Sequence, residues 1–261
     1  MNREELTSLK GWFNDYCRSF YADDINEQRN ISLKETHTYR VCDNILGLAE
    51  GLALGDSDTN LAETIALFHD VGRFPQYRQY RTFKDADSVN HAALGVKVLA
   101  EENVLDKVDE EDMKVIIRAI GLHNVFSIPE DLEERTSLYV KLIRDADKLD
   151  IWRVFIEYYA QPENERASAV SLGFPDIPGY SQEVLDCALQ GKMANLSKLK
   201  TLSDFKLLQL SWVYDLNFPT SFRLVAERDY INLIADTLPK SDDISSALNL
   251  IREFTLRRSQ R

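Results

Sequence analysis

Cysteine is scarce in this sequence, and its placement argues against the structures that cysteine most often builds. Only three of the 261 residues are cysteine, Cys17, Cys42 and Cys187, and no two of them have C-x-x-C spacing. An odd number of widely separated thiols predicts neither a disulfide framework nor a thiolate zinc site. We interpret all three as reduced thiols, which are typical of the cytoplasm.

Long apolar runs are also missing. No apolar stretch approaches the roughly 20 residues that span a bilayer, and Met1 is followed by polar residues rather than by an export signal. With 44% hydrophobic and 28% charged residues, and only 10 Gly and 7 Pro, the composition is that of an ordinary globular protein. We therefore expect a cytoplasmic protein that neither enters nor binds a membrane.

Positive charge is in deficit. The chain has 31 Lys and Arg against 43 Asp and Glu, which gives a formal net charge of -12. A surface of this sign repels polyanions, so we expect no nucleic-acid polymer as a partner. A small phosphorylated ligand is still compatible with a negative surface, because a bound metal ion reverses the field locally.

Helical apolar spacing near the C-terminus indicates further core or the surface of a homodimer.

Helical periodicity dominates the chain, and no alternating strand pattern or hairpin turn is evident. The sequence predicts an all-α protein with one domain over residues 1–261, made of a core at about 30–160 and a C-terminal helical extension at about 181–258. Ser32 and Glu35 have capping-box spacing and predict the start of a helix that runs to about Leu54. Residues 55–58 are predicted to end this helix and to start a second one that runs into His69 and Asp70. Other helices are predicted after Ser88 and at about 109–122, 134–160, 181–190, 203–214, 221–238 and 242–257. Residues 73–87 and 161–180 are predicted to be irregular.

All four histidines are predicted to point inward. At 100 degrees per residue, His37, His91 and His123 each fall on the apolar stripe of a predicted helix. His69 lies in a segment, 61–71, that is apolar around most of its circumference. A single inward histidine is usually a core residue bonded to a backbone carbonyl. Four of them from four helices favour a shared site.

Aspartates join this inward set. Asp70 follows His69, and in the segment 138–154 both Asp147 and Asp150 fall within the apolar arc, whereas Asp145 falls outside it. A carboxylate in a core needs a counter-charge, because its burial costs several kcal/mol. A divalent metal ion satisfies imidazoles and carboxylates together. The pattern therefore favours a metal site, with Asp147 and Asp150 both open as the last carboxylate.

Two local motifs make this pattern more specific. Residues 67–73 (LFHDVGR) look like an apolar-apolar-H-D-apolar-G-[KR] signature, and residues 145–150 (DADKLD) look like a D-x-D-[KR]-L motif. With His37 ahead of them, they resemble the HD superfamily of metal-dependent phosphohydrolases, which is named for the His-Asp dipeptide. The resemblance covers about residues 30–160 and implies an HD-type helical bundle.

The resemblance also implies a set of metal ligands. In the closing motif the second aspartate is the ligand, which selects Asp147. One metal ion is then held by His37, His69, Asp70 and Asp147. His91 and His123 match the additional histidines of the two-metal branch, with Asp70 shared between two ions. Histidine and carboxylate ligands accept Fe, Mn, Mg, Zn or similar divalent ions, so the identity of the metal stays open.

The implied reaction is hydrolysis of a phosphomonoester or phosphodiester, in a nucleotide or related small metabolite, by a metal-activated hydroxide. The two-metal branch includes cyclic-di-GMP phosphodiesterases of the HD-GYP type and dinucleoside tetraphosphate hydrolases, but the GYP signature is absent after Asp70. Asp70 is the expected shared catalytic ligand. Two alternatives stay open: a di-iron oxygenase with the same fold and ligand pattern, and a non-catalytic sensor that binds a nucleotide or metal.

Several cations near the motifs are candidates for phosphate contacts. Arg73 occupies the basic position of the His-Asp signature, and Lys148 follows Asp147, so both are expected to act in catalysis. Arg73 is also a candidate substrate-binding residue, together with Arg78, Arg81 and Lys84, because guanidinium groups bind phosphate oxygens bidentately. Solvated loop charge is the competing interpretation for the last three.

Overall fold

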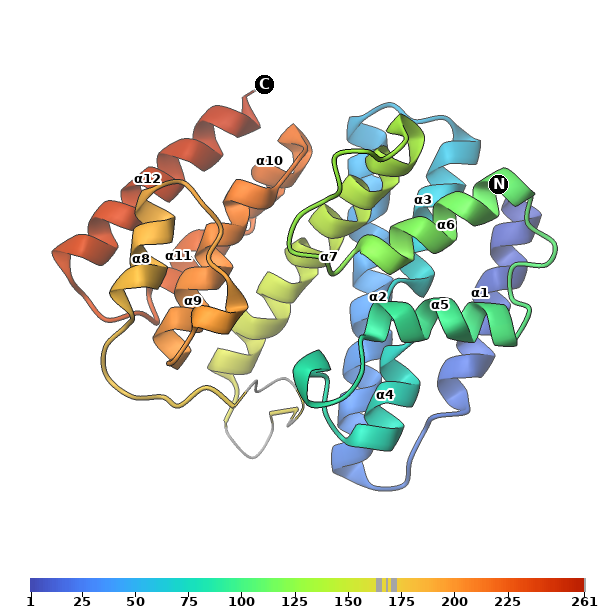
Figure 1. Ribbon diagram of the computed structural model, residues 1–261, viewed down its shortest axis with the longest axis horizontal. Coiled ribbons are helices and arrows are strands. Elements are labelled where there is room, and N and C mark those ends of the chain that lie inside the picture. Colours follow the sequence, from blue (N-terminus) through green and yellow to red (C-terminus); the bar gives the residue numbers. More distant parts are fainter. Residues whose placement is uncertain (163–165, 168, 170–172, 261) are drawn as a thin grey trace. The chain divides into compact units, whose positions relative to one another are not determined.

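The computed structural model describes residues 1–162, 166–167, 169 and 173–260 (Figure 1). These residues form helices and no strand, which confirms the predicted all-α class. The chain divides into two compact units. The first consists of Met1–Asp150 and Gln161–Val170, and the second of Ile151–Ala160 and Ser171–Arg261. The predicted single domain stays a prediction. No described helix combines the length and the apolar character needed to cross a membrane.

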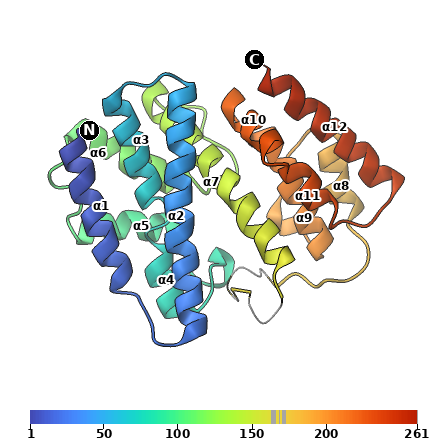
Figure 2. The ribbon, with the colours of Figure 1, turned by 180° about the vertical axis from the view of Figure 1, so that it is seen from behind.

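The first unit is a bundle of helices around α3. Its helices are α1 (Arg3–Arg18), α2 (Ile25–Gly51), α3 (Asp56–Phe68), α4 (Arg73–Tyr80), α5 (His91–Glu101), α6 (Glu110–Leu122) and the first part of α7 (Glu134–Ala160). Helix α3 packs against α1, α2 and α6, and every residue from Leu61 to Phe68 is buried (Figures 1 and 2). The predicted complete burial of this segment is confirmed. His69 follows its last turn and lies inside the unit.

The N-terminal part of the chain differs from the sequence prediction. Helix α1 was not predicted, although Asn2 and Glu5 form a capping box at its start. The predicted start of α2 at Ser32 is wrong: the helix begins at Ile25, because the Asp24 side chain accepts hydrogen bonds from two backbone N–H groups of its first turn. Ser32 lies inside α2, where its hydroxyl accepts a hydrogen bond from Gln28.

The segment after the His-Asp dipeptide was predicted to be a loop and is partly helical. Helix α4 covers residues 73–80, and Asp85–Asp87 forms a short 3-10 helix, η1. Pro75 lies in the first turn of α4, where a backbone N–H has no intrahelical acceptor and proline is tolerated. Arg81 ends the helix with left-handed backbone, φ 60°. An eight-residue helix offers too few turns for its periodicity to be visible in the sequence.

Other helix boundaries also differ from the sequence prediction. Helix α5 is capped by Asn90 rather than by Ser88, because the Asn90 side chain accepts a hydrogen bond from the backbone of Ala93. The single helix predicted at 221–238 is two, α10 (Pro219–Glu227) and α11 (Tyr230–Ala235), because Asp229 between them has left-handed backbone, φ 55°. The helices predicted at 109–122 and 134–160 are confirmed as α6 and α7.

The second unit packs further helices against the last turns of α7. These are α8 (Gln182–Leu189), α9 (Leu202–Ser211), α10, α11 and α12 (Asp242–Ser259), with short 3-10 helices η4 (Leu196–Lys198) and η5 (Trp212–Asp215). Trp152 is buried against the rings of Trp212 and Tyr230, and α10 packs along α12 (Figure 2). The predicted irregular segment 161–180 lies partly outside the described residues; its residues 173–180 form no helix.

The start of α2 can be tested by removing its cap. We expect Asp24→Ala to lower the free energy of unfolding by about 1 kcal/mol, because two N–H groups lose their acceptor. Chemical denaturation measures the change. Asp23→Ala, an exposed carboxylate next to it, is the matched control and should change stability much less. A larger loss from Ser32→Ala than from Asp24→Ala would contradict this helix start.

Candidate metal centre

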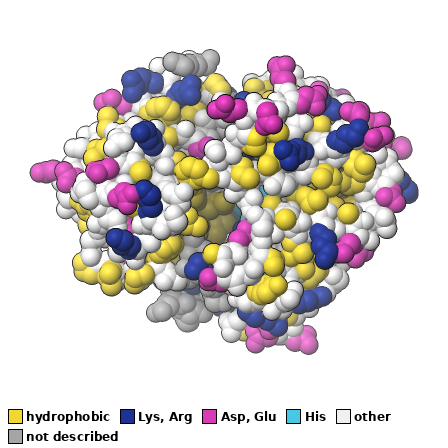
Figure 3. All heavy atoms as spheres, in the orientation of Figure 1, with side chains coloured by type: hydrophobic (Ala, Val, Ile, Leu, Met, Phe, Trp, Pro, Cys, Tyr) yellow, Lys and Arg dark blue, Asp and Glu magenta, His cyan; other side chains and the backbone are white. Residues whose placement is uncertain are grey.

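The four histidines come from four helices and are all buried. His37 lies in the middle of α2, His69 follows the last residue of α3, His91 is the first residue of α5, and His123 follows the last residue of α6. Their exposed fractions are only 0–5%, and histidine atoms show only as small spots on the face drawn in Figure 3. Their predicted burial is confirmed.

Two of these histidines are fixed by the helix that ends at them. Nδ1 of His69 lies 2.7 Å from the carbonyl oxygen of Ala66, and Nδ1 of His123 lies 2.7 Å from that of Ile120. A carbonyl oxygen only accepts hydrogen bonds, so Nδ1 carries the proton in both rings. The Nε2 lone pair of each neutral ring is therefore free to bind something else.

The other two histidines are fixed by carboxylates. Nδ1 of His37 lies 2.7 Å from Oδ2 of Asp150, and Nδ1 of His91 lies 2.7 Å from Oδ2 of Asp85. Both carboxylates accept a hydrogen bond from Nδ1–H, which again leaves Nε2 without a proton in the neutral ring. Asp150 therefore orients the His37 ring through Nδ1, on the side away from Nε2.

All four free Nε2 atoms face one another in pairs. Nε2 of His37 lies 3.4 Å from Nε2 of His69, and Nε2 of His91 lies 3.0 Å from Nε2 of His123. Two bare lone pairs at such distances repel unless a positive charge lies between them or beside them. The arrangement therefore requires a proton or a metal ion at each pair.

Asp70 lies between the two pairs and divides its oxygens between them. Its Oδ2 is 3.6 Å from Nε2 of His37 and 3.7 Å from Nε2 of His69. Its Oδ1 is 3.4 Å from Nε2 of His91 and 3.9 Å from Nε2 of His123. Two groups with the spacing of a metal site result, each containing two histidines and Asp70. One carboxylate thus joins both groups.

Asp147 completes the first group from α7. Its Oδ1 lies 3.1 Å from Nε2 of His37 and 3.7 Å from Nε2 of His69, and it is buried without a hydrogen-bond partner. A buried carboxylate oxygen without a donor is costly, and a cation removes that cost. The residues present therefore fit a divalent metal ion. The fit also separates Asp147, which faces the free nitrogens, from Asp150, which binds the protonated side of His37.

Residues 35–152 match the family model of the HD domain. The chain contains an HD domain. The matched residues include all six predicted metal ligands, and proteins of this superfamily are mostly metal-dependent hydrolases. Comparison with curated proteins and with solved structures gave no match. The family and the two His/Asp groups rest on independent observations, one from the sequence and the other from side-chain geometry.

The pKa shifts of two histidines and of Asp70 favour the binding of a cation in the HD domain. Burial, together with His91 and His69, lowers the pKa of His123 to about 3, and burial and Arg73 lower the pKa of His91. Both imidazoles are therefore neutral, as metal binding requires. For Asp70, burial acts to raise the pKa, but Lys34, His69 and Arg73 hold it well below its usual value.

His37 differs from the other histidines of the HD domain. Burial and Lys34 act to lower its pKa, but the carboxylates of Asp147 and Asp150 outweigh them and raise it. A proton on Nε2 of His37 would occupy the same space, facing Asp147, that a metal ion would occupy. Proton and metal therefore compete for this nitrogen.

Three residues that support the two His/Asp groups were not predicted from the sequence. Lys34 places Nζ 2.7 Å from Oδ2 of Asp70, and Asp85 holds His91. Arg144 is buried and donates hydrogen bonds to the carbonyl oxygens of His123 and Val125, which fixes the end of α6. Lys34 lies one helical turn before His37, so the helical wheel carried a signal for it. The other two contacts depend on how distant segments fold together.

The prediction for Asp145 is wrong. It was placed outside the apolar arc of α7, but its side chain is fully buried. Leu142, Ile143 and Ala146 around it are buried as well, so this part of α7 is enclosed on more than one side. A single apolar arc does not describe such a helix.

Arg73 lies beside the site but is occupied by protein groups. Its Nε is 3.4 Å from Oδ1 of Asp70, and its Nη1 donates hydrogen bonds to Asp85, Gln76 and the carbonyl oxygen of Phe83. Arg73 therefore connects Asp70, the shared carboxylate, with Asp85, the carboxylate that orients His91. Its direct contact with a substrate stays a prediction.

The other predicted substrate cations contact groups outside the two metal-type clusters. Arg78 donates a hydrogen bond to the carbonyl oxygen of Ser19, Arg81 pairs with a Glu27 oxygen at 2.6 Å, and Lys84 pairs with an Asp87 oxygen at 3.0 Å. Lys148 follows Asp147 on α7 and is half-buried. The substrate-binding roles of Arg78, Arg81 and Lys84 and the catalytic role of Lys148 stay predictions.

One close backbone contact sets the distance between the two parts of the HD site. A Cβ atom on Gly72 would lie 2.2 Å from the carbonyl oxygen of His91 and 2.5 Å from the backbone nitrogen of Gly95. Only glycine therefore lets the turn after Asp70 approach the start of α5 this closely. Because Asp70 and His91 lie on either side of this contact, Gly72 helps to place them together.

Gly72→Ala tests this contact. The added methyl group must separate the turn from α5, so we expect a loss of about 1–3 kcal/mol in the free energy of unfolding and loss of the ion expected at His91 and His123. Denaturation and metal analysis by mass spectrometry measure both effects. Gly121→Ala is the control, because its Cβ would only touch Val96 at 3.8 Å. Unchanged stability and metal content in the Gly72 variant would refute the argument.

Proposed function

We propose that the chain is a metal-dependent phosphohydrolase that cleaves a phosphomonoester or phosphodiester in a nucleotide or related small metabolite. The observation that carries the proposal is the meeting of four histidine Nε2 atoms with the divided carboxylate of Asp70. The match to the HD domain supports it, because that superfamily is mostly metal-dependent hydrolases.

The proposed ligands form two overlapping groups. The first ion would be held by His37, His69, Asp70 and Asp147, and the second by Asp70, His91 and His123. When bound, such ions lower the pKa of a shared water and attract the phosphate oxygens. Nitrogen and carboxylate ligands of this kind accept Fe, Mn, Zn or similar ions, so the proposal does not specify the metal.

The residues of the chain would orient these ligands and balance their charge. Hydrogen bonds from Nδ1 of His37 and His91 to Asp150 and Asp85 prevent either ring from turning, which keeps both Nε2 atoms aimed at the site. Lys34 supplies a positive charge at Asp70, where phosphate oxygens would also gather. A lysine in this place could hold the substrate phosphate once the ions have taken over Asp70.

Metal analysis combined with a substrate panel tests the proposed activity. Protein purified without chelators should contain up to two divalent ions per chain and should release phosphate, or cleave a diester, from at least one member of a panel of phosphomonoesters, phosphodiesters and nucleotides. Treatment with EDTA should abolish turnover, and added metal should restore it. Oxygen-dependent turnover without phosphate release would favour the di-iron oxygenase instead. Tight nucleotide binding without any turnover would favour a non-catalytic sensor.

Shared and unshared ligands should behave differently on substitution. We expect Asp70→Asn to lose both ions and to lower turnover by at least about 100-fold, because one carboxylate serves both groups. His123→Ala should lose only the second ion. Asp43→Asn, an exposed substitution with the same change in charge, is the control. Two ions retained in the Asp70 variant would contradict the shared ligand, and two ions retained in the His123 variant would contradict the second group.

Lys34 can be separated from the metal ligands. Lys34→Met should keep the full metal content, because removing a competing cation from Asp70 does not weaken its bonds to metal, while kcat/KM should fall by about tenfold or more. Lys34→Arg should recover part of the activity. Lys97→Met, an exposed lysine of α5, is the control. Parallel loss of metal and activity would show that Lys34 acts only on the structure of the site.

A further inference from the structure

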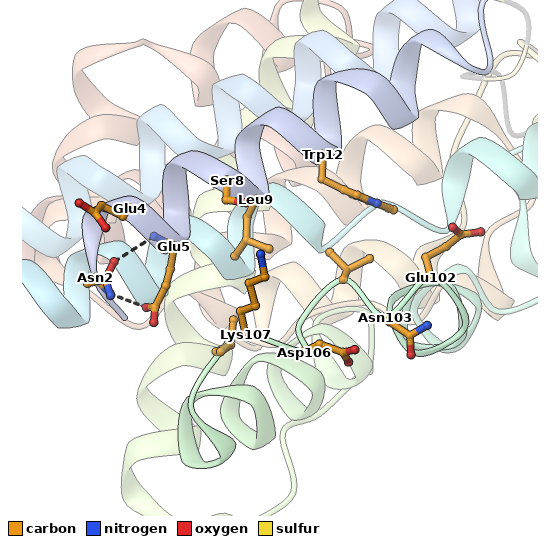
Figure 4. Close-up of a pocket in the computed structure, with 12 residues that line it drawn as sticks. Asn2, Glu4, Glu5, Ser8, Leu9, Trp12, Glu102, Asn103, Asp106 and Lys107 are labelled. Atoms are coloured by element: carbon orange, nitrogen blue, oxygen red, sulfur yellow. Dashed lines mark hydrogen bonds between the residues drawn. The ribbon is translucent and has the colours of Figure 1, made fainter.

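A pocket lies in the first unit, apart from the candidate metal ligands. It has a volume of about 570 Å³ and lies between α1 and the segment that joins α5 to α6 (Figure 4). None of the six candidate ligands lines it. A pocket of this volume is large enough for a small organic molecule.

The aromatic ring of Trp12 lines this pocket, and contacts with two other aromatic rings hold it in place. Its ring stacks on Tyr16, with centroids 4.7 Å apart and an interplanar angle of 18°, and it meets Phe68 edge-on at 5.9 Å. Leu9 and Val104 add apolar surface. In Figure 4 the indole extends from α1 toward the segment that carries Glu102 and Asn103. A ring already held in this way loses little freedom when a flat ligand binds against it.

The charged groups that line the pocket are mostly acidic. The carboxylates are those of Glu4, Glu5, Glu102 and Asp106, and Lys107 is the opposing charge. Glu5 already accepts a hydrogen bond from the backbone of Asn2 as part of the cap of α1. Among the described residues, no ion pair involves the other three carboxylates. Three carboxylates thus remain available at the rim of an aromatic pocket.

We propose that this pocket binds a small organic cation, with an aromatic or apolar body against Trp12 and an ammonium group toward Glu102 and Asp106. An anion would meet the acidic rim, and the chain as a whole carries a charge of -12. A neutral molecule would leave the carboxylates unused. A cation of this kind gains the ion–carboxylate attraction at its ammonium end and contact with the indole along its body.

Three ligands of similar size test the proposal. They are phenethylammonium, the neutral phenethyl alcohol and the anion hydrocinnamate, each titrated into the full chain with isotope-labelled tryptophan. The indole N–H resonance of Trp12, assigned through Trp12→Phe, should shift with the cation and saturate at a dissociation constant on the order of 1 mM, as expected for so small a ligand. The resonances of Trp152 and Trp212 report on the other unit and should not move.

The variants identify which contacts matter. Trp12→Leu should weaken binding of the cation about fivefold, and the pair Glu102→Gln with Asp106→Asn should remove most of the preference for the cation over the alcohol. Glu101→Gln is the matched control, because Glu101 is exposed, pairs with Lys97 and does not line the pocket. Both substituted carboxylates are exposed, so these variants should fold normally even if the Trp12 variant does not.

Three results would overturn this inference: no saturable shift of the Trp12 resonance, equal affinity for the alcohol and the cation, or unchanged affinity in the double carboxylate variant. Binding is measured without turnover, so these outcomes do not depend on the proposed hydrolase activity.

Discussion

The structure of the candidate centre depends on one unfavourable interaction, the meeting of imidazole lone pairs in a buried space. Each histidine uses Nδ1 to bind a carbonyl or carboxylate oxygen, so Nε2 is left without a proton and turned toward another Nε2. Such an arrangement is stable only around positive charge. Asp70 connects the two pairs because its two oxygens face different histidines. The chemistry proposed for the protein follows from this requirement for cations.

Helix ends determine where these groups meet. His69 and His123 each follow the last residue of a helix, and each is held by a carbonyl oxygen of that helix's final turn. His91 begins α5, where Asp85 of the preceding 3-10 helix holds its ring. The burial of α3 and the close approach at Gly72 then fix the distances between these ends. The same packing that forms the core therefore sets the geometry of the site.

The sequence predicted those parts of the structure that depend on local patterns. The inward direction of the histidines was visible in their helical spacing, and the two motifs identified the HD resemblance and the choice of Asp147. What it missed depends on contacts between distant segments or on enclosure from several sides. Arg144 reaches back to the end of α6, and Asp145 is buried because α7 is surrounded. The helix α4 was missed because eight residues carry too weak a periodic signal.

The ion pair between Lys34 and Asp70 bears on how the protein would acquire a metal ion. A buried carboxylate without compensation would oppose folding by several kcal/mol. Lys34, with Arg73 on the other side of Asp70, supplies that compensation from the chain itself. The burial of Asp70 is therefore offset before any ion binds. An ion that binds to the folded bundle would then exchange with the surroundings, and its occupancy would follow the free concentration of metal.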